Sequence, residues 1–149
     1  DETMASHPTA GGSQRRRIQT FQFEKQIKQD SARAETKLCA NEQIRGIGHV
    51  IHPGECNDLH YESGADEFWI VLAGRARFCG SGGILIGEFS VNDGIMIPRN
   101  TEYLIENVGT EKLEMIQVAA IHRGTEDKRV DLVKSDERRP VNRFSGRAL

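Results

Sequence analysis

One stretch of the chain, residues 54–74, combines the pattern of a buried strand with several side chains that can bind metals or transfer protons. Its sequence is GECNDLHYESGADEFWIVLAG. The run after Glu67 is apolar, rich in residues that suit a pleated surface, and ends at a glycine, which predicts a buried strand followed by a turn. Because side chains two residues apart in a strand share a face, Glu67 and Trp69 point the same way, as do His60 and Glu62.

Two acidic side chains in this stretch need an explanation. An ionised carboxylate that faces a core costs free energy unless it is paired, hydrogen-bonded or bound to a cation, so Glu62 and Glu67 beside His60 suggest a metal ion. The alternative places both acids in a solvated hairpin loop, because residues 63–66 have the composition of a turn, and leaves His60 on the surface. Short motifs often match by chance, so the spacing alone favours the alternative.

The same stretch resembles the first motif of the cupin family, G-x5-H-x-H-x4-E-x6-G. Gly54, His60, Glu67 and Gly74 occupy matching positions, and Glu62 stands where the second histidine usually lies. The resemblance therefore extends beyond the acidic pair to the glycines on either side of it.

A second segment, NDGIMIPRNTEYLIEN, resembles the second cupin motif, G-x5-P-x-G-x2-H-x3-N. The residues at its fixed positions are Asn92, Pro98, Asn100, Tyr103 and Asn107. The two asparagines replace glycines, and Asn100 can adopt the left-handed conformation that glycine usually provides. Tyr103 stands in place of the histidine. Strand-like segments extend the likeness over residues 44 to 121.

The resemblance implies an all-β fold, an antiparallel double-stranded β-helix or jelly-roll barrel. Many short strands separated by turns are typical of such a closed double sheet. Strand patterns occur at residues 18–23, 43–52 and 112–121, the first of them as an edge strand. The predicted organisation is a flexible leader at 1–14, the cupin barrel at 15–122 and a polar extension at 123–149.

The extension predicted after His122 carries charges of both signs and few large apolar residues. It is expected either to wrap a partner subunit or to be disordered. Its VDLV segment could add a strand to a sheet edge, which would fit a homodimer with exchanged termini.

Composition narrows the class of protein. The formal net charge of -2 offers no basic field for nucleic acid. The longest nearly apolar run, residues 68–74, is too short to cross a bilayer, and no export signal is visible, so we expect a cytoplasmic protein without a membrane partner. Three cysteines without C-x-x-C spacing argue against a disulfide framework or a zinc ribbon.

By the resemblance, the ligand positions meet inside the barrel. His60, Glu62 and Glu67 would bind a divalent metal ion, with Tyr103 as the fourth ligand. This oxygen-rich set suits iron, manganese or zinc, and open coordination positions would accept a substrate oxygen. We therefore predict a small cupin enzyme that uses the metal for isomerisation, dehydration or lyase chemistry on a small oxygen-rich metabolite. Glu62, Glu67 and Tyr103 are its predicted catalytic residues.

Three alternatives keep the fold. The first is an iron-dependent cupin oxygenase, and the second is a cupin that binds a ligand without chemistry. The third is a metal-free enzyme in which one carboxyl acts as acid and the other as base, because two carboxylates in a dry cavity do not both ionise easily. Tyr103 and His60 would then relay protons. His49 and His52 are left out of the metal set, because a lone strand histidine is more often a wall residue.

Overall fold

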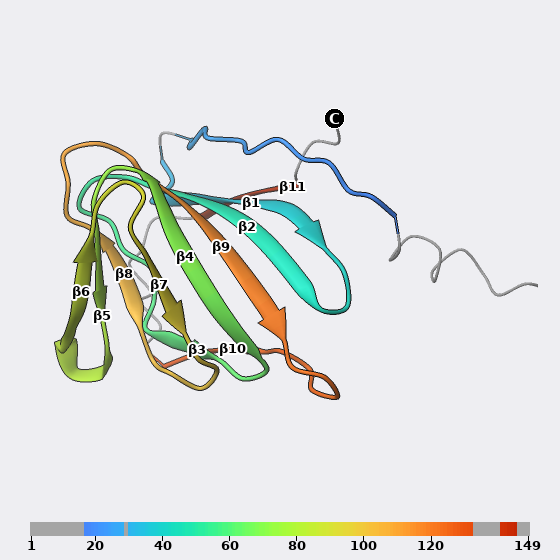
Figure 1. Ribbon diagram of the computed structural model, residues 1–149. Coiled ribbons are helices and arrows are strands. Elements are labelled where there is room, and N and C mark those ends of the chain that lie inside the picture. Colours follow the sequence, from blue (N-terminus) through green and yellow to red (C-terminus); the bar gives the residue numbers. More distant parts are fainter. Residues whose placement is uncertain (1–16, 29, 133–140, 146–149) are drawn as a thin grey trace, which may run out of the picture.

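The computed structural model describes residues 17–28, 30–132 and 141–145, and these build an all-β fold (Figure 1). The described residues contain one short 3-10 turn, η1 (Ser81–Gly83). The strands, in chain order, are β1 (Arg33–Ala40), β2 (Ile44–Ile51), β3 (His60–Glu62), β4 (Ala65–Ala73), β5 (Ala76–Cys79), β6 (Leu85–Phe89), β7 (Gly94–Ile97), β8 (Leu104–Asn107), β9 (Leu113–Ile121), β10 (Arg129–Asp131) and β11 (Val141–Ser145). The predicted fold class is confirmed.

The strands form three sheets. The largest has the order β11-β1-β2-β9-β4-β7, and the others are β6-β5-β8 and the two-stranded ribbon β10-β3. In Figure 1 the long strands β2, β9 and β4 run side by side, and the short strands β5, β6 and β8 lie beside them as a second layer. Neighbouring strands pair antiparallel, except that β1 and β11 are parallel.

The core lies between the two larger sheets. Strands β4 and β9 alternate buried with more exposed residues, as expected for sheets with one face on a core. Trp69 from β4 lies 6.1 Å from Phe78 of β5, measured between ring centroids, and Phe78 stacks on Tyr103 at 5.9 Å. These rings join the two layers, and the strands predicted at 43–52 and 112–121 are present as β2 and β9.

The turns explain how the chain tolerates asparagine at the glycine positions of the second motif. Asn92 and Asn100 have φ angles of 72° and 63°, in the left-handed region that asparagine enters more readily than most residues. Gly74 ends β4 with φ +84°, and a Cβ atom there would lie 2.8 Å from the carbonyl oxygen of Lys112. The expectation for Asn100 is confirmed.

The prediction of an edge strand at residues 18–23 is wrong. These residues form a single bridge, at Gln22, and no strand. The side-chain amide of Gln19 makes the edge contacts that a backbone ladder would make, because its Nε2 donates to the Ala40 carbonyl at 2.7 Å and its Oε1 accepts from the Ala40 N–H at 3.0 Å. The Phe23 ring packs against Gly48, where a Cβ atom would approach it to 2.6 Å.

The segment after residue 122, predicted as a polar extension, contributes two strands to the fold. β10 pairs with β3 of the same chain and β11 pairs with β1. The leader predicted at residues 1–14 lies outside the described residues. In the described part of the chain, no helix has the length and hydrophobicity that crossing a membrane requires.

Candidate functional site

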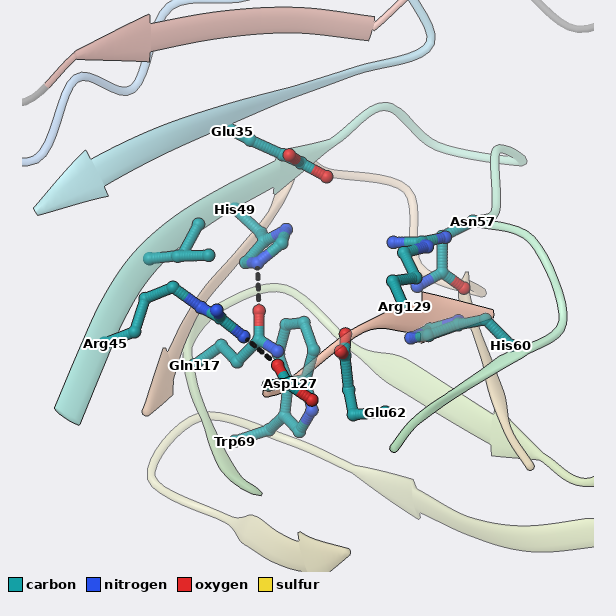
Figure 2. Close-up of a pocket in the computed structure, with 11 residues that line it drawn as sticks. Glu35, Arg45, His49, Asn57, His60, Glu62, Trp69, Gln117, Asp127 and Arg129 are labelled. Carbon is teal, nitrogen blue, oxygen red and sulfur yellow. Dashed lines mark hydrogen bonds and ion pairs between the residues drawn. The ribbon is translucent and has the colours of Figure 1, made fainter. Parts of the chain in front are cut away.

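A cavity of about 210 Å³ opens inside the fold, between the inner face of the large sheet and the β3–β10 ribbon (Figure 2). Most of the side chains around it are polar or charged. Its lining residues are Glu35, Arg45, Ile47, His49, Asn57, His60, Glu62, Trp69, Gln117, Asp127 and Arg129. A cavity with this lining suits a small polar ligand.

The short ribbon of β3 and β10 presents four functional groups on one face. In β3, His60 and Glu62 are buried and lie two residues apart, so they share that face. The antiparallel register places Arg129 opposite Glu62 and Asp131 opposite His60. Strand pairing therefore brings an H-x-E segment and an R-x-D segment together beside the cavity.

His60 is held as a neutral imidazole of defined tautomer. Its Nδ1 lies 2.7 Å from the Asp58 carbonyl oxygen, and because a carbonyl can only accept, Nδ1 carries the hydrogen. The lone pair of Nε2 is then available. Burial, together with the charge of Arg129, lowers the pKa of His60 to about 4. Its ring packs on Tyr103, with centroids 4.5 Å apart.

Glu62 has a pKa far above the usual value for a glutamate. Burial, together with the nearby charges of Glu67 and Asp127, raises its pKa to about 8. Glu62 also hydrogen-bonds to Asp127, so the protonated carboxyl is the donor and Asp127 the acceptor. At neutral pH, Glu62 is a buried acid that still carries its proton.

Asp127 is the ionised partner. Burial opposes its ionisation, but hydrogen bonds from Arg45, the Gly64 N–H and Glu62 outweigh burial and hold its pKa below the usual range. The Arg45 Nη2 to Asp127 Oδ2 distance is 2.6 Å, and the Gly64 N to Asp127 Oδ1 distance is 3.0 Å.

Glu67 and Tyr103, the other two predicted ligands, are buried in the wall behind the cavity and do not line it. Tyr103 Oη donates to Glu67 Oε2 at 3.0 Å and accepts from Trp69 Nε1 at 3.2 Å. Gln117 Nε2 donates to the same oxygen of Glu67. Burial raises the pKa of both Glu67 and Tyr103, so the phenol stays protonated.

The wall continues to His49, whose Nε2 lies 2.8 Å from Gln117 Oε1. Since the amide oxygen accepts, Nε2 carries the hydrogen, and burial lowers the His49 pKa to about 4. Glu35 lies opposite His49 in the sheet. Burial opposes its ionisation, but electrostatic interactions with His49 and Arg33 outweigh burial and lower its pKa. Figure 2 shows His49 and Gln117 on one side of the cavity and His60 on the other.

The site therefore contains residues that sequence reasoning did not select. His49 lies in a predicted strand and is two residues from Ile51, so the strand period places it on the same face as that buried core residue, which is a usable signal. Gln117 is one of the alternate buried residues of β9, on the same face as Met115 and Ala119. Asp127 and Arg129 follow the last motif and had no such signal, because only the pairing of β10 with β3 brings them to the cavity.

The described donors do not fit a bound metal ion as they are arranged. Within residues 17–28, 30–132 and 141–145, no group of three or more His, Cys, Asp or Glu side chains could hold one. Glu67 already accepts hydrogen bonds from Tyr103 and Gln117, and Glu62 is turned to Asp127. The metal set of His60, Glu62, Glu67 and Tyr103 stays a prediction, whereas the shifted pKa values of His60 and Glu62 suit proton transfer.

Comparison with known proteins finds a relative whose sequence is similar over part of this chain. No family model matches the chain. Mannose-1-phosphate guanylyltransferase ManC of Salmonella typhimurium (strain LT2) is 33% identical over 97 residues, which cover 64% of this chain. The matched region spans only 18% of that relative, so the likeness concerns one part of a much longer protein.

Solved structures match more of the chain. A protein of Klebsiella pneumoniae with a double-stranded β-helix domain has a TM-score of 0.59 and 15% identity, covering 72% of this chain and 90% of that one. An RmlC-like cupin family protein of Methanocaldococcus jannaschii has a TM-score of 0.55 and 22% identity, covering 68% and 92%. Oxalate decarboxylase of Bacillus subtilis has a TM-score of 0.51 and 22% identity, covering 62% and 24%. At these identities the likeness is one of fold.

Proposed function

Because this chain has the double-stranded β-helix fold of the cupins, we propose that it is a small cupin enzyme that performs acid–base chemistry in the cavity. Its reaction is an isomerisation, dehydration or lyase step on a small oxygen-rich metabolite such as a hydroxy acid or a sugar. One observation carries the proposal: Glu62 and His60 share a face of β3, and the acid keeps its proton while the imidazole is neutral, with Nε2 unprotonated. Titratable pairs whose pKa values are pushed apart in this way identify an acid and a base.

In the proposed reaction, His60 accepts a proton through Nε2 from the carbon next to a carbonyl or carboxyl group of the substrate. Glu62 donates its proton to the substrate oxygen on which negative charge develops. After this step the imidazole is protonated and the carboxyl is ionised. Return of a proton from His60 to the substrate carbon and of the enol proton to Glu62 restores both groups. Exchange of the His60 proton with water before its return introduces deuterium in D₂O.

The surrounding residues hold these groups in position. The Asp58 carbonyl fixes the His60 tautomer, and Asp127 orients the Glu62 proton. Arg45 keeps Asp127 ionised, which lets it remain an acceptor for Glu62. Glu67 and Tyr103 act from behind the cavity as the support for Gln117 and Trp69.

The proposal is tested by proton exchange, which needs no product assay. The wild type is incubated in D₂O with a panel of hydroxy acids and sugars, and loss of the substrate C–H signal is followed by NMR. We expect exchange with at least one compound, slowed by about a hundredfold or more in Glu62→Gln and in His60→Gln. The control is Glu106→Gln, an acid outside the cavity lining. Equal exchange rates in wild type and both variants would overturn the proposal.

A second candidate adds a divalent metal, iron, manganese or zinc, to the same site. It is favoured by the neighbour oxalate decarboxylase of Bacillus subtilis, which is described as having Mn(II) centres. Here the metal form would require Glu62 to lose its proton and Glu67 to give up its bonds to Tyr103 and Gln117. Titration with Mn(II), followed by EPR, separates this candidate from the first. Stoichiometric binding that Glu62→Gln abolishes would favour the metal form.

A further inference from the structure

One side of the cavity carries a guanidinium with unused donors. Arg129 Nε donates to Asp131 Oδ1 at 2.8 Å. Among the described residues, the Arg129 guanidinium makes no other hydrogen bond. The two Nη groups remain for a ligand. Arg129 lines the cavity, and strand pairing with β3 fixes where it enters. Figure 2 shows Arg129 beside His60 and Asn57, on the side away from Arg45.

Asn57 adds a second oriented donor on that side. The residue is buried, and its Oδ1 accepts from the Ile105 N–H at 2.7 Å. A backbone N–H can bond only to the oxygen of the amide, so the orientation of the side chain is determined. The Nδ2 group is therefore the part of Asn57 that is left for the cavity, which this residue lines.

We infer that Arg129 and Asn57 form a carboxylate-binding subsite, which holds the acid group of the substrate beside His60 and Glu62. This inference rests on the proposed function, because it assigns the substrate class of the same cavity. A guanidinium fork matches the two oxygens of a carboxylate, and charge-assisted hydrogen bonds of this kind are the strong ones. The substrate class is then a small hydroxy or oxo acid.

The charges around the cavity favour a monoanion over a phosphate dianion. Arg45 is paired with Asp127 and Arg33 with Glu35, so their charges are already offset. Arg129 is partly offset by Asp131. The remaining positive charge is therefore less than that of one free guanidinium, and a dianion would also meet the ionised carboxylates that line the cavity.

Binding of the acid group also couples to the chemistry. The charge of Arg129 helps to keep His60 neutral in the free protein. A carboxylate bound at Arg129 offsets that charge, so His60 becomes a better proton acceptor when the substrate is in place. The carbon next to the carboxylate then lies on the side of the cavity occupied by His60.

The test is a titration of the full chain with glycolate, lactate and inorganic phosphate, followed by NMR of the side-chain N–H signals and by calorimetry. Two variants remove the donors: Arg129→Gln, and Asn57→Asp, which keeps the oxygen that accepts from Ile105. The control is Arg123→Gln, which removes the same charge outside this cavity. Thermal unfolding of each variant confirms that it is folded.

We expect a carboxylate to bind the wild type and the control with equal affinity, and to bind both more tightly than phosphate does. In each of the two variants we expect the affinity for the carboxylate to be about tenfold or more weaker. Failure of both carboxylates to bind, tighter binding of phosphate, or unchanged affinity in the folded variants would overturn the subsite. The proposed function fails separately, if carboxylates bind through Arg129 but Glu62→Gln and His60→Gln leave proton exchange unchanged. If proton exchange requires Glu62 and His60 but carboxylate affinity is unchanged in the Arg129 and Asn57 variants, only the subsite proposal is overturned.

Discussion

Glu62 and Arg129 lie directly opposite each other across the antiparallel pair of β3 and β10, and both side chains line the cavity. An acid and a base so placed would ordinarily form an ion pair. Here Glu62 keeps its proton, because burial and the charges of Glu67 and Asp127 raise its pKa to about 8. The charge of Arg129 is therefore left for Asp131 and for a ligand.

The raised pKa of Glu62 predicts how stability changes between pH 4.5 and about 8. In the unfolded chain this carboxyl titrates near its model value of 4.5, so between that pH and about 8 the folded state holds one more proton. The contribution of Glu62 to the free energy of unfolding is fully present below pH 4.5. It is lost as the pH rises toward 8, by up to about 1.4 kcal/mol per pH unit. Urea unfolding at pH 6.5 to 8 measures this slope. Glu62→Gln should flatten it, and an unchanged slope would contradict the assignment.

The buried histidines predict the opposite trend on the acid side. His49 and His60 have pKa values lowered to about 4, against 6.5 in the unfolded chain. The unfolded state binds more protons in that window, so the stability these groups contribute is present above pH 6.5 and is lost as pH falls toward 4. Urea unfolding from pH 6.5 to 4 should show this loss, and His49→Gln should reduce it. His122→Gln, a more exposed histidine, is the control. Equal slopes in all three proteins would refute this account.

Tyr103→Phe tests whether this residue supports the wall. Removing the hydroxyl leaves Trp69 Nε1 without an acceptor and Glu67 with one donor fewer, in a place where Tyr103 is fully buried. We expect a loss of about 1–3 kcal/mol in the free energy of unfolding. The matched control is Tyr61→Phe on β3, a half-buried tyrosine that should cost less. A stable Tyr103→Phe that lost all proton exchange would instead make the hydroxyl catalytic.

Gly94→Ala tests the close approach of β7 to β4. A Cβ atom at Gly94 would lie 2.5 Å from the backbone oxygen of Trp69, so the strands must separate. Overpacking of this kind costs about 1–3 kcal/mol. In Gly80→Ala the nearest atom would lie 3.7 Å away, which is ordinary contact. Thermal unfolding of the two variants should rank Gly94→Ala as clearly less stable, and equal midpoints would show that β7 shifts without cost.

Metal removal distinguishes the two candidate functions. The described acids are hydrogen-bonded to protein groups, so we expect treatment with EDTA to leave both the thermal midpoint and proton exchange unchanged. The measurement is calorimetry and D₂O exchange before and after chelation, with elemental analysis of the untreated protein. Activity that disappears with EDTA and returns with Mn(II) would favour the metal form.

Several parts of the fold could be predicted because they follow from local chemistry. The run after Glu67 became β4 and the segment at 112–121 became β9, since alternation of side-chain burial is a property of the strand itself. Asn100 adopts the left-handed conformation that its position requires. The prediction of a strand at 18–23 was wrong, because Gln19 bonds to the edge of the sheet through its side chain. A pattern of apolar residues carries no information about such a contact.

By itself, the sequence determined an all-β chain with two cupin-like motifs, and the burial of His60, Glu62, Glu67 and Tyr103. Only the tertiary structure decided which of these residues face the cavity and which lie behind it. The same holds for Arg129, which follows both motifs in the chain. The reason is that spacing specifies the face of one strand, whereas the register between distant strands comes from hydrogen bonds and packing that form only when the whole sheet assembles.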